Sequence, residues 1–263
     1  MFYSRFYGLL KLHKRYGNGL AGFGIFLWKV FAIHVLYKEK IIVWSSKIKW
    51  IVHRDFQSSK NPWYYGISEK TEFEFLLQNV KSGDVLYDIG ANVGLYSIWL
   101  AAFHPIQCYL FEPDPKHQDF ILRLIHLNHL ESKCFLQSYA LGDENGFRYL
   151  TTGQDMNNKV SAQNTKLSIA IRALDDLNEL PKPNILKIDT EGYELKILEA
   201  GLQTLKSEML RIIIIEKSET QFEECHKIIV SFGFKPLITS SNSSCTKEEI
   251  PITQSGNVIY IKN

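Results

Sequence analysis

Four acidic residues in this sequence each follow a short apolar run that predicts a β-strand, and each is followed by a turn. They are Asp88, Glu112, Asp189 and Glu216. Ligands of open α/β sheets bind outside the carboxyl ends of the strands. A single acid there can simply favour the N-terminus of the next helix, but four at one sheet edge predict a ligand site.

The first of these acids opens a turn with glycine at both ends. The stretch from Asp88 to Gly94 reads Asp-Ile-Gly-Ala-Asn-Val-Gly, and an apolar helical pattern begins at Leu95. Gly90 can adopt a positive φ, and the lack of a Cβ at Gly90 and Gly94 lets a ligand approach the backbone. The turn does not have the G-x-G-x-x-G spacing of a dinucleotide-phosphate site. The acid before it suits a ligand that carries a positive group.

Glu112 narrows the class of ligand. It lies 24 residues after Asp88, at the end of the predicted strand 108–111. An acid at about this distance from a glycine turn is placed to accept two hydrogen bonds from a ribose diol. The pattern therefore predicts a nucleoside without a pyrophosphate, with a positive charge near Asp88.

The elements that must position these residues follow from the hydrophobic pattern. Strands are predicted at 85–88, 108–111, 134–139, 185–188, 210–215, 234–238 and 257–261, and helices at 68–79, 95–103, 116–128, 192–205 and 220–232. Alternation of strands and helices predicts a parallel sheet with helices on both faces. Residues 140–143 are predicted to form a turn, and 148–150 and 167–171 to form paired strands around the polar loop 152–165.

Charge is spread unevenly along the 263 residues. The chain has net charge +2, but residues 1–60 hold 11 Lys and Arg against two acids, a net +9, and residues 61–263 hold 19 against 26, a net −7. The pattern predicts a basic, aromatic N-terminal extension of helices and a β-hairpin at 1–60, followed by the main domain at 61–263. Nucleic acid is an unlikely substrate, because the main domain is acidic.

The extension has two open interpretations. Apolar residues at helical spacing from Phe23 to Tyr37 fit either a helix that packs on protein or an amphipathic segment, within residues 1–40, that rests on an anionic membrane. A signal peptide or a spanning helix fits poorly, because Lys29 interrupts the apolar run. The four cysteines have no metal-binding spacing and are expected to be reduced. We therefore expect a cytoplasmic protein, with membrane association at the inner face left open.

Five segments in order together resemble the FkbM family of methyltransferases, class I enzymes that use S-adenosyl-L-methionine. These segments are Asp88 to Gly94, Phe111 to Pro113, Ala140 to Asp143, Leu174 to Leu177 and Ile185 to Glu194. The resemblance implies an α/β, Rossmann-like fold in three α/β/α layers. Its seven-stranded sheet would be mostly parallel, with an antiparallel last strand.

The resemblance also implies roles for individual residues. Asp88, Gly90, Asn92 and Gly94 would hold the amino-acid end of the cofactor, Glu112 the ribose with help from Asp114, and Tyr139, Ala140 and Leu141 would lie beside the adenine. Asp189, Glu191 and Glu216 would be the catalytic residues on the acceptor side. The implied reaction is O-methylation of a hydroxyl on a sugar, glycan or polyketide-like acceptor.

A hydroxyl acceptor must lose a proton, and a carboxylate about 3 Å away could take it as general base. Asp189 is the first candidate, because it ends the strand next to the expected switch point of the sheet; its alternative role is to cap the following helix. The three acids could instead hold a divalent metal through oxygen ligands, but nothing in their spacing requires one, and no metal is predicted. Two other classes stay open: a catalytically idle cofactor-binding scaffold and a nicotinamide-dependent oxidoreductase.

Overall fold

The protein divides into two compact units, Met1–Ser68 and Glu69–Asn263. The structure is a computed structural model that describes residues 20–67, 69–150, 160–161, 167–217, 221–237 and 256–262. Composition places the domain boundary between residues 60 and 61, and that placement stays a prediction. Most of the polar loop 152–165 lies outside the described residues.

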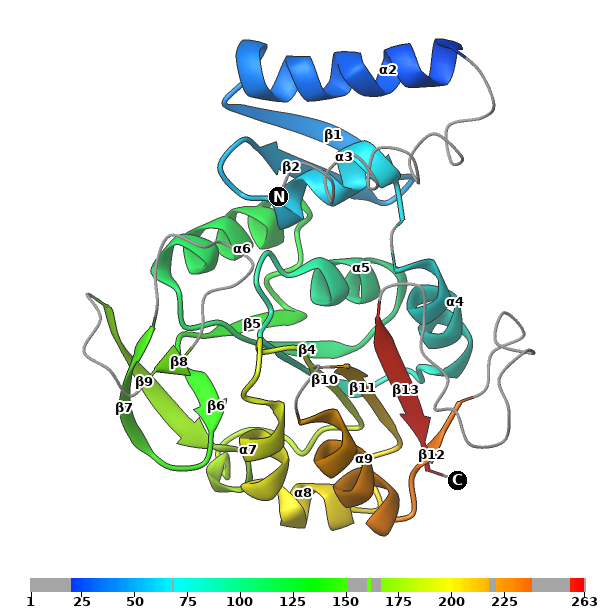
Figure 1. Ribbon diagram of the computed structural model, residues 1–263. Helices are drawn as coiled ribbons and strands as arrows, with labels where there is room; N and C mark the ends of the chain where they lie inside the picture. Colours follow the sequence, from blue (N-terminus) through cyan, green and yellow to red (C-terminus); the bar gives the residue numbers. More distant parts are fainter. Residues whose placement is uncertain are drawn as a thin grey trace. The chain divides into compact units, whose positions relative to one another are not determined.

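The N-terminal unit combines helices with a two-stranded hairpin (Figure 1). Its elements are α2 (Leu20–Phe31), η1 (Ala32–Leu36), β1 (Glu39–Ser45), β2 (Ile48–His53), η2 (Ser58–Lys60) and α3 (Asn61–Tyr65). β1 and β2 pair antiparallel. Trp50 is fully buried and packs on Trp44 at 5.1 Å between ring centroids, so this unit has a small core of its own. Over the described part of the chain, no helix has both the length and the apolar content needed to cross a bilayer.

The second unit is built on a seven-stranded sheet with the order β12-β13-β11-β10-β3-β4-β5. The strands are β3 (Val85–Ile89), β4 (Gln107–Phe111), β5 (Cys134–Gln137), β10 (Ile185–Ile188), β11 (Ile212–Glu216), β12 (Lys235–Pro236) and β13 (Asn257–Ile261). Only β13 runs antiparallel to its neighbours. The predicted α/β fold, with its mostly parallel sheet and antiparallel last strand, is confirmed. Strand order reverses between β3 and β10, which makes that boundary the switch point of the sheet.

Helices cover both faces of this sheet (Figure 1). α4 (Lys70–Asn79), α5 (Leu95–Phe103) and α6 (Pro115–Leu127) lie on one face; α7 (Glu194–Glu199), α8 (Leu202–Lys206) and α9 (Phe222–Ser231) lie on the other. On the first face Phe73 stacks on Trp99 at 4.2 Å. On the second, Leu198, Leu205 and Ile229 are buried against the sheet. This confirms the three α/β/α layers.

The cysteines within the described residues are reduced, as expected. Cys108, Cys134 and Cys225 are free and buried. Cys245 lies outside the described residues.

A second, four-stranded sheet has the order β6-β9-β7-β8. Its strands are β6 (Ala140–Gly142), β7 (Gly146–Leu150), β8 (Val160–Ser161) and β9 (Leu167–Ala173). The predicted pairing of residues 148–150 with 167–171 is confirmed. Two expectations are wrong: the strand expected at 134–139 ends at Gln137, and residues 140–142 form β6 rather than a turn. Because Ala140 and Leu141 are buried, their backbone groups need partners, and the parallel pairing of β6 with β9 supplies them.

The prediction of a single helix at 192–205 is also wrong, because this segment forms two helices. α7 ends at Glu199 and α8 begins at Leu202. The break at Gly201 packs closely against Leu174, since a Cβ there would lie 2.6 Å from the Leu174 side chain. Asp175 then accepts hydrogen bonds from the backbone N–H groups of Gln203 and Thr204 at 2.7 and 2.8 Å. A distant carboxylate therefore caps α8, which local sequence cannot indicate.

Candidate functional site

Asp88 lies near the carboxyl end of the fully buried strand β3, beside the switch point. Its side chain is 1% exposed. Oδ2 accepts a 2.7 Å hydrogen bond from the Ser97 hydroxyl on α5. Oδ1 has no hydrogen-bond partner and lies 3.5 Å from the Lys187 ammonium. Oδ1 therefore retains capacity to accept a hydrogen bond from a ligand.

The turn after β3 is shaped for close approach of backbone and ligand. Gly90 has φ +73°, and a Cβ added there would lie 1.9 Å from the Asp189 carbonyl oxygen. Gly94 has φ +75° and precedes the first residue of α5. Asn92 also has positive φ, 53°, and its buried Oδ1 has no hydrogen-bond partner. A buried, unpaired acceptor calls for a donor, which a polar ligand over this turn would provide.

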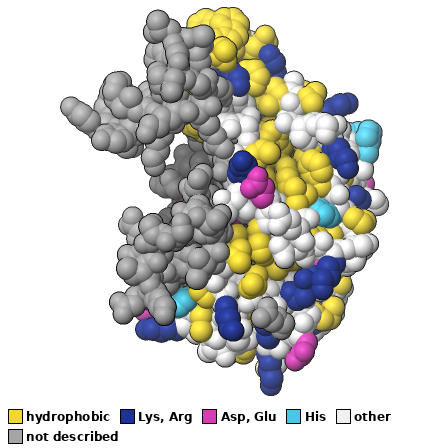
Figure 2. Space-filling model, turned by 90° about the vertical axis from the view of Figure 1, so that its right-hand side faces the viewer, with side chains coloured by type: hydrophobic (Ala, Val, Ile, Leu, Met, Phe, Trp, Pro, Cys, Tyr) yellow, Lys and Arg dark blue, Asp and Glu magenta, His cyan; other side chains and the backbone are white. Residues whose placement is uncertain are grey.

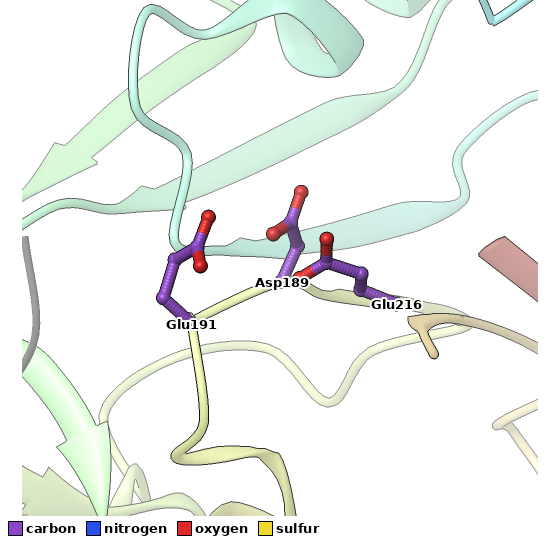
Figure 3. A group of neighbouring side chains, drawn as sticks. All are labelled: Asp189, Glu191 and Glu216. Atoms are coloured by element: carbon purple, nitrogen blue, oxygen red, sulfur yellow. The ribbon is translucent and has the colours of Figure 1, made fainter. Parts of the chain in front are cut away.

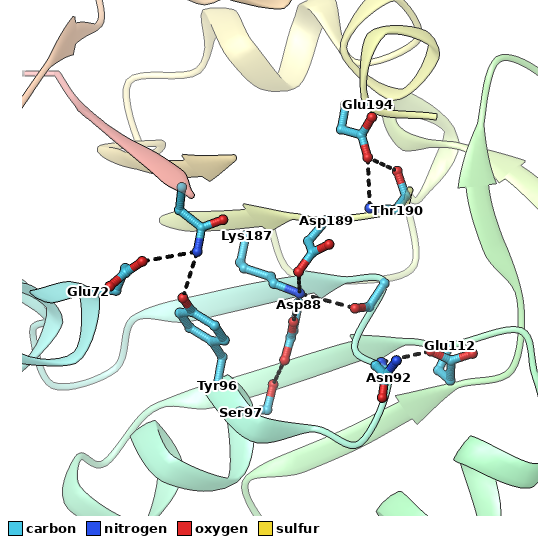
Figure 4. A network of polar contacts seen from close by, with 12 residues as sticks. Glu72, Asp88, Asn92, Tyr96, Ser97, Glu112, Lys187, Asp189, Thr190 and Glu194 are labelled. Atoms are coloured by element: carbon cyan, nitrogen blue, oxygen red, sulfur yellow. Dashed lines mark hydrogen bonds and ion pairs between the residues drawn. The ribbon is translucent and has the colours of Figure 1, made fainter. Parts of the chain in front are cut away.

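Glu112 follows β4 and faces the same turn (Figure 4). Its carboxylate accepts hydrogen bonds from the N–H of Asn92 at 2.8 Å and from the N–H of Asp114 at 2.9 Å. These bonds fix the carboxylate against the glycine turn. Burial raises the pKa of Glu112 to about 7, although His117 and the two N–H donors act in the opposite direction.

This shift predicts pH-dependent cofactor binding. If Glu112 binds the ribose, as the family resemblance implies, its ionised form above pH 7 would accept from both hydroxyls, and protonation below pH 7 would remove part of that capacity. We expect the Kd for S-adenosylmethionine to rise by up to about tenfold per pH unit between pH 7 and 5.5. Isothermal titration calorimetry across that pH range measures this change in Kd. Glu112→Gln should bind weakly with little pH dependence; an equally steep dependence in this variant would assign the effect to another group.

The other residues predicted to bind the cofactor, Asp114, Tyr139, Ala140 and Leu141, lie in different parts of the fold. Asp114 is the N-cap of α6 and accepts from the Lys116 N–H at 2.9 Å; its help at the ribose stays a prediction. Tyr139 is half-buried and lies 5.7 Å from Phe111 between ring centroids. Ala140 and Leu141 are buried in β6. Their contact with adenine stays a prediction.

Three carboxylates meet at the carboxyl ends of β10 and β11 (Figure 3). Ile188 and Ile215 are in register, so Asp189 and Glu216, the residues that follow or end these strands, lie side by side. Glu191 joins them from the loop after β10, and one oxygen from each of the three lies within 4.8 Å of the others. Burial, with the charges of Asp189 and Glu191, raises the pKa of Glu216 to about 8. We call these three residues the acidic trio.

Lys187 links the acidic trio to the glycine turn. It stands beside Asp88 in register across β10 and β3. Its ammonium lies 3.2 Å from Asp189 and donates to the Gly90 carbonyl at 3.1 Å (Figure 4). Burial alone would lower the pKa of Lys187, but the Asp189 and Asp88 carboxylates raise it further than burial lowers it. Lys187 is therefore a buried cation that holds both acids in place.

Glu194 sets the loop that carries Asp189 and Glu191. It is fully buried, and its Oε1 accepts from the Thr190 N–H at 2.8 Å, the Thr190 hydroxyl at 2.9 Å and the Gly192 N–H at 3.1 Å. Sequence reasoning assigned no role to Lys187 or Glu194. A lysine inside an apolar central strand was the available signal, because such a residue is rarely buried without a partner.

Comparison with known proteins decides the family. The sequence profile of the methyltransferase FkbM domain matches residues 88–236, more than half of the chain. The chain belongs to the FkbM methyltransferase family. Its cofactor is S-adenosyl-L-methionine, and the unpaired acceptors at Asp88 and Asn92 fit a ligand with N–H and O–H donors.

Individual relatives are distant from this FkbM protein. The hexuronic acid methyltransferase AglP of Haloferax volcanii is 27% identical over 56% of this chain, and the match spans 62% of that relative. Methyltransferase sdnD of Sordaria araneosa is 24% identical, covering 59% of this chain and 78% of the relative. The crystal structure of Methyltransferase FkbM from Methylobacillus flagellatus is 14% identical, with a TM-score of 0.49 over 98% of this chain and 59% of that one.

Proposed function

We propose that this protein is an S-adenosylmethionine-dependent O-methyltransferase that acts on a hydroxyl group of a sugar or glycan. The acidic trio carries the proposal. A hydroxyl must lose its proton when it is methylated, and a group of carboxylates at the switch point can accept that proton. The distant relative named for a hexuronic acid favours a sugar over a polyketide-like acceptor.

The acidic trio also favours one of the two oxygen acceptors that a sugar can offer, a hydroxyl or a carboxylate. A sugar carboxylate is already ionised and needs no base, and the ionised members of the trio, whose oxygens lie within 4.8 Å of one another, would repel it. A neutral hydroxyl meets no such repulsion and needs the base. We therefore propose an ether-forming rather than an ester-forming reaction.

Within the trio we propose Glu216 as the base. Sequence alone favoured Asp189, but Asp189 is engaged by the Lys187 ammonium at 3.2 Å. The pKa of Glu216, raised to about 8, lies near the operating range that suits a general base. Asp189 and Glu191 would then orient the acceptor hydroxyl and favour proton uptake by Glu216.

Bound S-adenosylmethionine would supply a methyl group that its sulfonium already activates. Asp88, Asn92 and Glu112 would hold the cofactor with the backbone of Gly90 and Gly94. The protein would then need to place the acceptor oxygen in line with the methyl group, and such positioning can contribute several kcal/mol. Lys187 contacts both Asp88 and Asp189. It would therefore hold the cofactor side and the acceptor side of the site in fixed positions.

A methyl-transfer assay tests this proposal. Labelled S-adenosylmethionine is supplied with neutral oligosaccharides and with hexuronate-containing ones, and the products are treated with mild alkali. We expect label in an alkali-stable methyl ether. Alkali-labile label would show a methyl ester and contradict the role of the base. Tight cofactor binding without transfer to any acceptor would favour a scaffold, and loss of turnover in EDTA restored by Mg²⁺ would make the trio a metal site instead.

A further inference from the structure

We propose that the N-terminal unit docks on an anionic membrane surface through the exposed apolar side chains of α2 and η1. These side chains, the apolar face, are those of Leu27, Trp28, Phe31, Val35 and Leu36. Their exposed fractions run from 46% at Phe31 to 61% at Val35. Single exposed apolar residues are ordinary, but a contiguous group marks an interaction site.

The spacing places the helical members of this face together. Leu27, Trp28 and Phe31 of α2 stand at i, i+1 and i+4, which lies within one side of an α-helix, and Val35 and Leu36 follow in η1. The Trp28 and Phe31 rings lie 5.9 Å apart. On β1, Val43 is also exposed, between the half-buried Ile42 and Trp44. Exposed apolar side chains therefore occur on the hairpin as well as on the helices.

The opposite side of the same segment already forms the core of the unit. Phe26 and Ile33 are 6% and 1% exposed, and Phe26 packs edge-on against Tyr64 at 5.7 Å. The Lys29 ammonium donates to the Trp63 carbonyl at 2.8 Å, and the Trp63 indole donates to the Lys29 carbonyl at 3.2 Å. The helix is thus fixed within its unit, and the apolar face remains for an external partner.

The positive charge of the N-terminal unit favours an anionic membrane as its partner. Residues 20–67 hold seven Lys and Arg against two acids. Lys38 is exposed just after η1, and Lys49 is exposed opposite Val43 in the β1–β2 register. Figure 2 shows hydrophobic side chains at the surface with Lys and Arg side chains beside them. Apolar side chains among basic ones match lipid tails below anionic headgroups, whereas a symmetric pairing of two copies would bring like charges together.

The geometry predicts binding in the plane of the interface. α2, with 12 residues, and η1, with 5, follow one another directly and contain Lys29 and His34, whereas a span needs about 20 apolar residues. An amphipathic helix at the interface buries its apolar side by roughly 5–10 Å. The unit would therefore be a peripheral anchor, independent of what the methyltransferase site accepts.

Vesicle flotation of the full chain tests the proposal. One set of vesicles contains phosphatidylcholine alone, and the other adds phosphatidylglycerol. We expect binding to the anionic set, at least about tenfold stronger than to the neutral set and weakened by salt.

Trp28→Ser with Phe31→Ser should lower that binding about tenfold or more, and Lys38→Glu with Lys49→Glu should lower it by about fivefold per lysine or more. Leu122→Ser is the matched control, since Leu122 is 53% exposed on α6 in the other unit, and should bind like wild type.

Three results would overturn the proposal. The first is no flotation with either vesicle set. The second is flotation that Trp28→Ser with Phe31→Ser leaves unchanged while circular dichroism shows a folded chain. The third is a stable dimer that this double variant converts to a monomer, which would make the apolar face a contact between copies. Unchanged S-adenosylmethionine binding in the variants would confirm that the methyltransferase unit is intact.

Discussion

Gly90→Ala is expected to abolish S-adenosylmethionine binding and to destabilise the second unit by more than about 3 kcal/mol. Alanine at φ +73° is strained, and its Cβ would lie 1.9 Å from the Asp189 carbonyl oxygen. The backbone at Asp189, just after β10, must move to relieve this overlap, which also disturbs the ion pair of Asp189 with Lys187. Chemical denaturation measures the stability, and isothermal titration measures the binding.

Gly83→Ala is the matched control for this prediction. Gly83 also has a positive φ, +84°, but an added Cβ meets nothing within 4 Å. It should therefore lose only about 1 kcal/mol from backbone strain and bind the cofactor like wild type. If Gly90→Ala behaved like Gly83→Ala in both measurements, the close approach of the turn to β10 would have no functional role.

Glu216→Gln is expected to lower kcat by about 10²–10⁴-fold, the contribution of a general base. Gln keeps the shape of the side chain but cannot accept the proton. S-adenosylmethionine affinity should stay within about twofold, because Glu216 is not among the residues assigned to the cofactor. The wild-type rate should rise with pH and level off above pH 8, since the pKa of Glu216 is raised to about 8.

The same substitution should stabilise the fold at high pH. The folded-state pKa of about 8 lies above the unfolded value near 4.3. The wild-type free energy of unfolding therefore falls as pH rises between these values, as the carboxylate ionises beside Asp189 and Glu191. With allowance for solvent screening, Glu216→Gln should be more stable than wild type by about 1–2 kcal/mol at pH 8.5 and equal to it at pH 4.

Glu223→Gln, an exposed acid on α9, serves as the control for both effects and should change neither rate nor stability. A Glu216→Gln enzyme with full activity would remove Glu216 from the reaction. If Asp189→Asn alone lost the activity, the base would be Asp189, the residue that the strand pattern favours.

The amino-acid sequence is most informative where a local pattern has one spatial outcome. Acids that end neighbouring parallel strands must meet at one sheet edge, so the strand pattern alone predicts that Asp189 and Glu216 lie close together. The glycine turn likewise allows a positive φ at Gly90 and a close approach to its backbone, and Gly90 has φ +73° with the Asp189 carbonyl next to it. Such features depend on strand direction and backbone geometry. Apolar runs and glycines in the sequence indicate both directly.

What the sequence could not predict depends on contacts between distant segments. The cap from Asp175 on α8 and the pairing of β6 with β9 join residues about 30 apart. The links from Lys187 to Asp88 and Gly90 cross about 100 residues. The shift from Asp189 to Glu216 as the proposed base has the same origin, because it follows from the Lys187 ion pair with Asp189 and from the burial of Glu216.

We expect the turn from Asp88 to Gly94, closed by Glu112, to hold S-adenosylmethionine. Isothermal titration of the full chain with S-adenosylmethionine, and separately with NAD⁺, tests it most directly. We expect one bound S-adenosylmethionine per chain and no heat from NAD⁺. Binding of NAD⁺ alone, or of neither compound to a folded chain, would contradict it.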